Sequence, residues 1–187
     1  MTTDTFWKII ERAKARSKGD LDVDYDELLH ELCELEIPEL MQWALIFEEY
    51  QTIARTEKLW AAAYLMNDGC TPSLFRCFVG WLVAQGRTVF MGALRDPETL
   101  ADLQIVAEDE AIFEEILHVS KSAYFHKLHV DTWDPAGFRA EQSKYILSRE
   151  TKEHICAEAV VGMDMDLMRD VNSYSEWLPK LSKKYAS

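Results

Sequence analysis

Apolar residues recur every three or four positions along most of this chain, which is the spacing that places side chains on one face of an α-helix. The most apolar stretch runs from Leu59 to Leu94 and contains few charged residues. It predicts two buried helices joined by a polar elbow at Asn67–Thr71, with Thr71 as the N-cap and Pro72 as the first residue of the second helix. The large apolar side chains expected to nucleate the core around this elbow are Trp60, Tyr64, Phe75, Phe78, Trp81 and Phe90.

Helical spacing predicts further helices before this block. Their apolar faces run from Phe6 to Ala13, from Tyr25 to Leu32 and from Leu40 to Phe47. Thr3 is the expected N-cap of the first helix, because it precedes an acidic first turn. Gly19 follows the basic last turn of that helix, where a glycine commonly ends a helix.

After the block, the pattern predicts a short helix at 89–94 and a turn of helix that starts at Asp96-Pro97-Glu98. A longer helix should follow, with the acidic residues 108–110 in its first turn and an inward face from Ile112 to Tyr124. One more helix is expected between Phe138 and Leu147. No stretch shows the alternation of apolar and polar residues that is typical of a half-buried strand.

Composition agrees with long helices. The chain has 187 residues, of which only seven are Gly and five are Pro, so it has few residues for tight turns. Its hydrophobic fraction of 48% is sufficient for one sizeable core. The predicted fold is all-α: a single compact bundle of about eight to nine helices, with residues 1–130 as the main body and residues 131–187 as a smaller helical extension.

Charge and cysteine usage restrict the class of protein. Acidic residues outnumber basic ones by 33 to 20, giving a formal net charge of −13 and a pI near 4.8, which disfavours binding to nucleic acid or to anionic membranes. No window approaches the ~18 consecutive apolar residues of a membrane span, and the start of the chain lacks the pattern of a signal peptide. The four cysteines are far apart and form no Cys-x-x-Cys motif, which indicates reduced thiols. We therefore expect a cytoplasmic protein.

The strongest charge asymmetry lies between Gly19 and Ala54, where the chain has no Lys or Arg but many acidic residues. This predicts an acidic surface that binds a basic protein. The side chains expected to contact that partner are Asp22, Asp24, Asp26, Glu48 and Glu49. The alternative is that these acids only keep the surface solvated.

The elbow provides a second candidate site. A buried charge requires a partner, so two arrangements are expected for the side chains of Arg76 and Arg87. They form ion pairs with Asp68 and the acidic segment, or their guanidinium groups line a pocket for an anion. The candidate ligand-binding residues are these two arginines, the elbow residues Asp68 and Cys70, and the aromatic walls Trp60, Tyr64 and Trp81.

Cys70 is the one candidate nucleophile that the elbow offers. It precedes a helix N-terminus, where the helix dipole would lower the thiol pKa and favour the thiolate. A base such as His118 or His154 would then have to lie close to it in space. The alternative is a packed turn cysteine, since free cysteines are among the most buried residues.

Two patterns imitate metal sites without completing one. The alternating aspartates from Asp20 to Asp26 resemble a calcium loop, but Tyr25 stands where that loop requires glycine. His126 and His129 could share a helix face, although zinc would need two more ligands from elsewhere. We therefore assign no metal ligand, cofactor or catalytic residue.

Several motifs occur in a fixed order along the chain: Phe6-Trp7-Lys8-Ile9-Ile10, Leu59 to Leu65, Gly69-Cys70, Phe78 to Leu82, Gln85-Gly86-Arg87, Asp96 to Asp102 and Leu178-Pro179-Lys180-Leu181. Together they resemble the bacterial family known as domain of unknown function 4240, over about the first two thirds of the chain. The resemblance implies an all-helical domain and no assigned activity. Thr71-Pro72-Ser73 follows the Gly-Cys pair where family members tend to carry acidic residues, which puts carboxylate chemistry at the elbow in doubt.

Two functions are expected from these patterns. The first is a non-enzymatic acidic binding protein with a basic protein partner, and an immunity or antitoxin-type inhibitor of a basic toxin is of this physical type. The second is an enzyme or small-ligand sensor that uses the aromatic and arginine residues around the elbow. Neither pattern indicates an oligomeric state.

Overall fold

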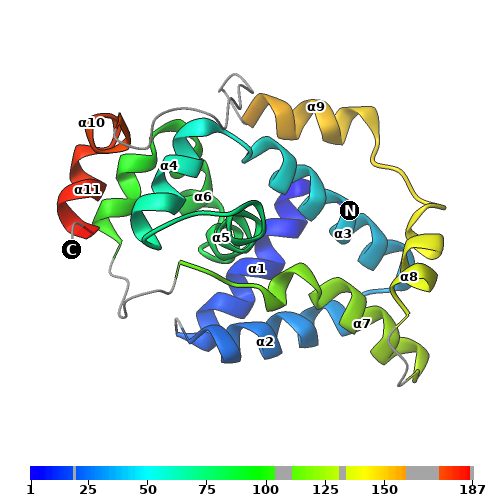
Figure 1. The fold of residues 1–187 in the computed structure, drawn as a ribbon. Helices are drawn as coiled ribbons and strands as arrows, with labels where there is room; N and C mark the ends of the chain where they lie inside the picture. Colours follow the sequence, from blue (N-terminus) through cyan, green and yellow to red (C-terminus); the bar gives the residue numbers. More distant parts are fainter. Residues whose placement is uncertain (19, 104–110, 131–133, 159–172, 186–187) are drawn as a thin grey trace.

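The computed structural model describes residues 1–18, 20–103, 111–130, 134–158 and 173–185, and those residues form helices without any strand (Figure 1). The α-helices are α1 (Thr3–Ser17), α2 (Leu21–Cys33), α3 (Ile37–Ile53), α4 (Glu57–Met66), α5 (Pro72–Ala84), α6 (Arg87–Arg95), α7 (Val119–Leu128), α8 (Pro135–Gln142), α9 (Arg149–Glu158), α10 (Tyr174–Trp177) and α11 (Pro179–Tyr185). The 3-10 helices are η1 (Pro97–Asp102) and η2 (Glu115–Leu117). The predicted all-α fold is confirmed. None of these helices has the length and apolar character needed to cross a bilayer.

Helix starts follow the capping signals in the sequence, with one shift. The side chain of Thr2 accepts a hydrogen bond from the Thr5 amide at 3.2 Å, so the N-cap of α1 is Thr2 and the expected Thr3 is already helical. Lys18 ends α1 in the left-handed conformation, and Gly19 lies outside the described residues. The C-cap amide of Lys18 donates to the Lys14 carbonyl, which closes the last turn.

The predicted elbow between α4 and α5 is confirmed. Thr56 caps α4, and the Thr71 side chain accepts from the Leu74 amide at 3.2 Å, with Pro72 as the first residue of α5. Gly69 has φ of +138°, a backbone conformation that L residues with side chains rarely adopt. The two helices therefore meet at a turn that the Thr-Pro and Gly signals determine locally.

The aromatic core extends from α1, α3 and α6 to α5, whose Phe75, Phe78 and Trp81 are buried as the sequence predicted. The Trp7 ring lies 4.8 Å from Tyr50 and 5.4 Å from Phe90, and the Phe6 ring lies 5.2 Å from Trp43, measured between ring centroids. All five side chains are fully buried. At the elbow, by contrast, Trp60 and Tyr64 stay half-buried.

A hydrogen-bonded chain crosses this aromatic core. The Trp7 indole donates to the Tyr50 hydroxyl at 3.0 Å, and Tyr50 donates to a carboxylate oxygen of Glu158 at 2.6 Å. Glu158 also binds the guanidinium of Arg87, which in turn pairs with Asp4. These contacts hold the end of α9 against α1, α3 and α6.

The residues after position 110 do not form the single long helix that was predicted from 108 to 124. Residues 104–110 lie outside the described part of the chain, and residues 111–114 are irregular before η2 and α7. The Phe113 amide donates to the Cys77 carbonyl of α5 at 3.1 Å, so its backbone is used for a tertiary contact. This contact overrides the helical spacing of the apolar residues.

Gly80 permits the close approach of this segment to α5. A Cβ atom at Gly80 would lie 2.7 Å from a side-chain carbon of Ile116 and 3.0 Å from the Phe113 carbonyl oxygen. Real Cβ contacts are rarely that short, and one of the two atoms belongs to the backbone. The missing side chain of Gly80 therefore lets this segment pack closely against α5.

A second predicted helix, from 138 to 147, is shorter than expected. α8 ends at Gln142, and the side chain of Ile146 is 82% exposed. The Gln42 side chain donates to the Ile146 carbonyl at 3.0 Å, which holds this irregular segment against α3.

Helices α1 and α2 pack as a pair whose charges neutralise each other. Arg12 and Arg16 on α1 form ion pairs with Glu31 of α2, and Arg16 also pairs with Glu27 at 3.0 Å. Between the helices, Asp24 is 6% exposed. Burial raises the pKa of its carboxyl group to about 6, and the positive charge of Lys14 offsets part of that rise. Glu27, Glu31 and Asp24 of the predicted acidic segment therefore face positive charges of α1.

Gly80→Ala should lower the free energy of unfolding by about 1–3 kcal/mol, because the added Cβ displaces Ile116 or the backbone at Phe113. Gly92→Ala on α6 is the matched control, since its nearest contact would be an ordinary 3.6 Å to Thr99. There, alanine should leave stability unchanged or raise it by up to about 1 kcal/mol. Urea unfolding of the three proteins measures both effects, and equal stability of the two variants would contradict the close-packing argument.

Asp24 should make stability depend on pH. Its pKa is about 6 in the folded protein and 3.8 for an unperturbed side chain, so the folded state holds its proton at pH 5 and the unfolded state does not. Lowering the pH from 7 to 5 therefore stabilises the wild-type protein through this residue. Urea unfolding measures the free energy of unfolding of Asp24→Asn and of wild type at both pH values. The value for Asp24→Asn minus the value for wild type should be lower at pH 5 than at pH 7 by about 1–2 kcal/mol. The same pH dependence in both proteins would contradict this assignment.

Candidate functional site

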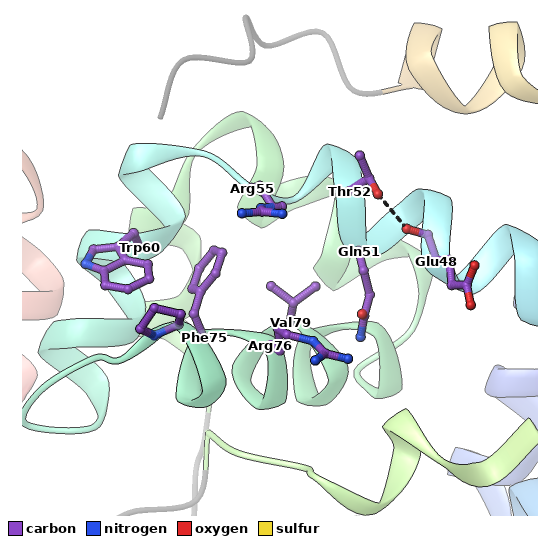
Figure 2. A pocket seen from close by; sticks show the side chains of 9 residues that line it. Glu48, Gln51, Thr52, Arg55, Trp60, Phe75, Arg76 and Val79 are labelled. Carbon is purple, nitrogen blue, oxygen red and sulfur yellow. Dashed lines mark hydrogen bonds between the residues drawn. The ribbon is translucent and has the colours of Figure 1, made fainter. Parts of the chain in front are cut away.

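A hollow of about 270 Å³ opens between α3, α4 and α5 (Figure 2). Its lining residues are Glu48, Gln51, Thr52, Arg55, Trp60, Pro72, Phe75, Arg76 and Val79. One end is apolar, with the rings of Trp60 and Phe75 5.2 Å apart between centroids. The other end holds the polar side chains of α3, and the two arginines lie between these ends (Figure 2).

Helical periodicity explains why these residues line one hollow. The four residues from α3 and the loop after it have the spacing i, i+3, i+4 and i+7, from Glu48 to Arg55. The four residues from α5 have the same spacing, from Pro72 to Val79. Each set therefore occupies one face of its helix, and the two faces lie opposite each other. Trp60, in the first turns of α4, closes the end of the hollow.

The arginines of the hollow have no acidic partner within the described residues. Arg55 and Arg76 are exposed side chains, and neither forms an ion pair or hydrogen bond with a residue that the structure describes. Glu48 is the one carboxylate in the lining, and it accepts a hydrogen bond at 3.0 Å from the side chain of Gln142 in α8. The hollow therefore carries an excess of positive charge in a strongly acidic protein.

One buried polar atom in the lining also lacks a partner. The side-chain nitrogen of Gln51 is shielded from solvent and donates no hydrogen bond among the described residues. A buried donor without an acceptor costs free energy. Two guanidinium groups and an amide donor beside an aromatic wall can bind an anionic group attached to a planar apolar body. The lining residues contain no histidine or cysteine, and so no obvious nucleophile with its base.

The structure brings together only two of the predicted ligand-binding residues, Trp60 and Arg76. Tyr64 packs against Tyr174 of α10, with ring centroids 5.5 Å apart. Trp81 is buried beside Phe78 on the inner side of α5. These two aromatic residues therefore belong to packing contacts rather than to the hollow.

The remaining elbow residues also lie elsewhere. Arg87 pairs with Asp4 and Glu158, so the predicted alternative of an ion pair applies to it, with partners other than Asp68. Asp68 is an exposed turn residue with φ of +48°. It forms no ion pair with either arginine among the described residues.

Cys70 differs from the prediction in its ionisation. Burial raises the pKa of its thiol to about 12, whereas the position before a helix was expected to lower it. The thiol lies 3.7 Å from the Thr71 carbonyl. A thiol in this environment stays protonated at neutral pH, which favours the alternative of a packed turn cysteine over the candidate nucleophile.

The five acidic residues predicted to bind a partner do not share one surface. Asp22 and Asp26 are exposed on α2, whereas Asp24 is buried between α1 and α2. Glu48 and Glu49 are on α3, where both line a second depression bounded by residues 145–147. Only the first two remain as a continuous exposed acidic pair on α2.

Sequence reasoning missed the α3 side of the hollow, including Gln51 and Arg55. The polar residues at 48, 51, 52 and 55 do form a stripe at helical spacing, which could have drawn attention to this face. Nothing local indicates that α5 lies opposite them. Within the described residues, no group of three or more potential metal ligands comes together, so the hollow remains the candidate site.

Comparison with known proteins gives one result. No curated protein and no solved structure matches the chain. The model of a family described as "Protein of unknown function (DUF4240)" matches residues 1–126, a range that includes every residue lining the hollow. The chain therefore belongs to the DUF4240 family.

Proposed function

We propose that the protein binds a small organic anion with a planar apolar part in the hollow between α3, α4 and α5. The observation that carries this proposal is the pair Arg55, in the loop after α3, and Arg76 on α5, which line the hollow without a carboxylate partner among the described residues. An anionic group would lie between these guanidiniums. The apolar body would lie against Trp60 and Phe75.

The overall charge makes the unpaired arginines informative. The chain has 33 acidic residues for 20 basic ones, so carboxylates are abundant. Arg12, Arg16 and Arg87 all take carboxylate partners from other helices. Two arginines that remain unpaired in one hollow favour a ligand that supplies the missing negative charge.

Phenyl phosphate is a suitable probe, because it joins a planar ring to one anionic group. Isothermal titration calorimetry should detect its binding to the wild-type protein, and Arg76→Ala should weaken that binding about tenfold by removing a charge-assisted hydrogen bond. Arg55→Ala should act in the same direction. Both side chains are exposed, so the fold should be retained.

Arg95→Ala is the control, since Arg95 is an exposed arginine of α6 without an ion pair among the described residues and outside the hollow. It removes the same charge and should leave the affinity for phenyl phosphate within about twofold of wild type. The proposal would be wrong if Arg76→Ala bound the probe as tightly as Arg95→Ala. Failure of the wild-type protein to bind phenyl phosphate would contradict it equally.

A cytoplasmic surface for a basic protein, such as an immunity or antitoxin function requires, is the second candidate. The observation that favours it is that Asp22 and Asp26 are exposed on α2 and form no ion pair with any residue that the structure describes, while Glu27 and Glu31 of the same helix are neutralised by α1. The cysteines at 33, 70, 77 and 156 are free thiols, which is consistent with a reducing compartment.

Co-purification with the product of the neighbouring gene tests this second candidate. Reversing two charges in Asp22→Lys with Asp26→Lys should weaken such a complex at least about tenfold, because the charges that attract a basic partner become repulsive. The control reverses two exposed acids elsewhere, Asp102→Lys with Glu176→Lys, and should retain the complex. Equal binding by both double variants, or binding that does not weaken with added salt, would rule out the α2 surface.

A further inference from the structure

Positive charge continues beyond the hollow onto α7 and α8. Lys121 of α7 and Arg139 of α8 form no ion pair within the described part of the chain. The Lys121 ammonium lies 3.3 Å from a ring nitrogen of His118. Lys121 is half-buried and Arg139 is exposed, so both can reach a ligand at the surface.

A side-chain contact links α8 to the rim of the hollow, and Lys121 is subject to the charges of Arg76 and Arg139. Burial lowers the pKa of Lys121, and the positive charges of Arg76 and Arg139 lower it further, whereas Glu48 opposes them. The contact from Gln142 to Glu48 places the last turn of α8 at the rim of the hollow. Arg139 precedes Gln142 by three residues, which puts both side chains on the same side of α8.

The resulting surface combines cations from α3, α5, α7 and α8 around one carboxylate. Its members are Arg55, Arg76, Lys121 and Arg139, with Glu48 among them. A monocarboxylate could neutralise one or two of these charges. A ligand whose negative charges are spread over several ångströms would engage all of them, and linked phosphate groups have this property.

We infer that the anion is a nucleoside diphosphate, an inference that rests on the proposed function. Its base would stack against Trp60 and Phe75, because aromatic side chains bind the faces of nucleobases. Its phosphates would extend past Arg55 and Arg76 toward Lys121 and Arg139.

The test titrates the full-length protein with ADP, with inorganic pyrophosphate and with phenyl phosphate. Wild-type protein should bind ADP at least about tenfold more tightly than either smaller probe, because only ADP reaches both the aromatic wall and the cations of α7 and α8. Lys121→Met with Arg139→Met should weaken ADP binding at least about tenfold and phenyl phosphate binding less than about twofold. Trp60→Leu should weaken ADP binding and leave pyrophosphate binding unchanged.

Lys8→Met with Arg95→Met is the matched control, since it removes two exposed positive charges outside the hollow and should leave ADP binding unchanged. The inference would be overturned if ADP bound no more tightly than phenyl phosphate, a result that needs no variant. It would also be overturned if the Lys121 and Arg139 variant weakened ADP and phenyl phosphate equally. In both cases the proposed function would stand as long as Arg76→Ala still weakened phenyl phosphate, so the two failures are distinguishable.

Discussion

The fold depends on the hydroxyl group of Tyr50, which is buried among aromatic rings and must be hydrogen-bonded there. Trp7 donates to it and Glu158 accepts from it, so one side chain of α3 joins α1 to α9. Removing either partner would leave a buried polar group unpaired. The free-energy cost of that unpaired group exceeds the net stabilisation that the hydrogen bond provides. This arrangement also fixes the rotation of α3. Since Tyr50 points into the core, its neighbour Gln51 is directed to the face that lines the hollow (Figure 2).

Local signals predicted the parts of the fold that local chemistry decides. The Thr71-Pro72 pair starts α5, and the Asp96 side chain caps η1, as the sequence indicated. Prediction failed where a distant contact uses the same backbone. Residues from Ile112 have good helical spacing, but the Phe113 amide is taken by the Cys77 carbonyl, and η2 packs against Gly80 instead. A pattern of apolar residues records which side chains are buried, and it does not record which backbone groups are already bonded.

The candidate site was predictable in its chemistry and only partly in its members. An aromatic residue and an arginine near the elbow were expected, and Trp60 and Arg76 do lie together. Arg87 was expected with them, because residue type alone cannot separate two arginines of one block. Its position at the start of α6 places it beside Glu158, more than 70 residues away along the chain. Arg55 was missed because α3 and α5 become neighbours only through the tertiary fold.

Net charge and local charge act at different ranges in this protein. At physiological ionic strength the field of the acidic surface is screened within about 8 Å, so the charge of −13 has little effect inside the hollow. There, the nearest charges are Arg55, Arg76 and Glu48, and the balance is positive. Arg12, Arg16 and Arg87, by contrast, have carboxylate partners on neighbouring helices. An acidic composition therefore argues against binding long polyanions along the surface, and it does not exclude a small anion enclosed between Arg76 of α5 and Arg55 of the loop after α3.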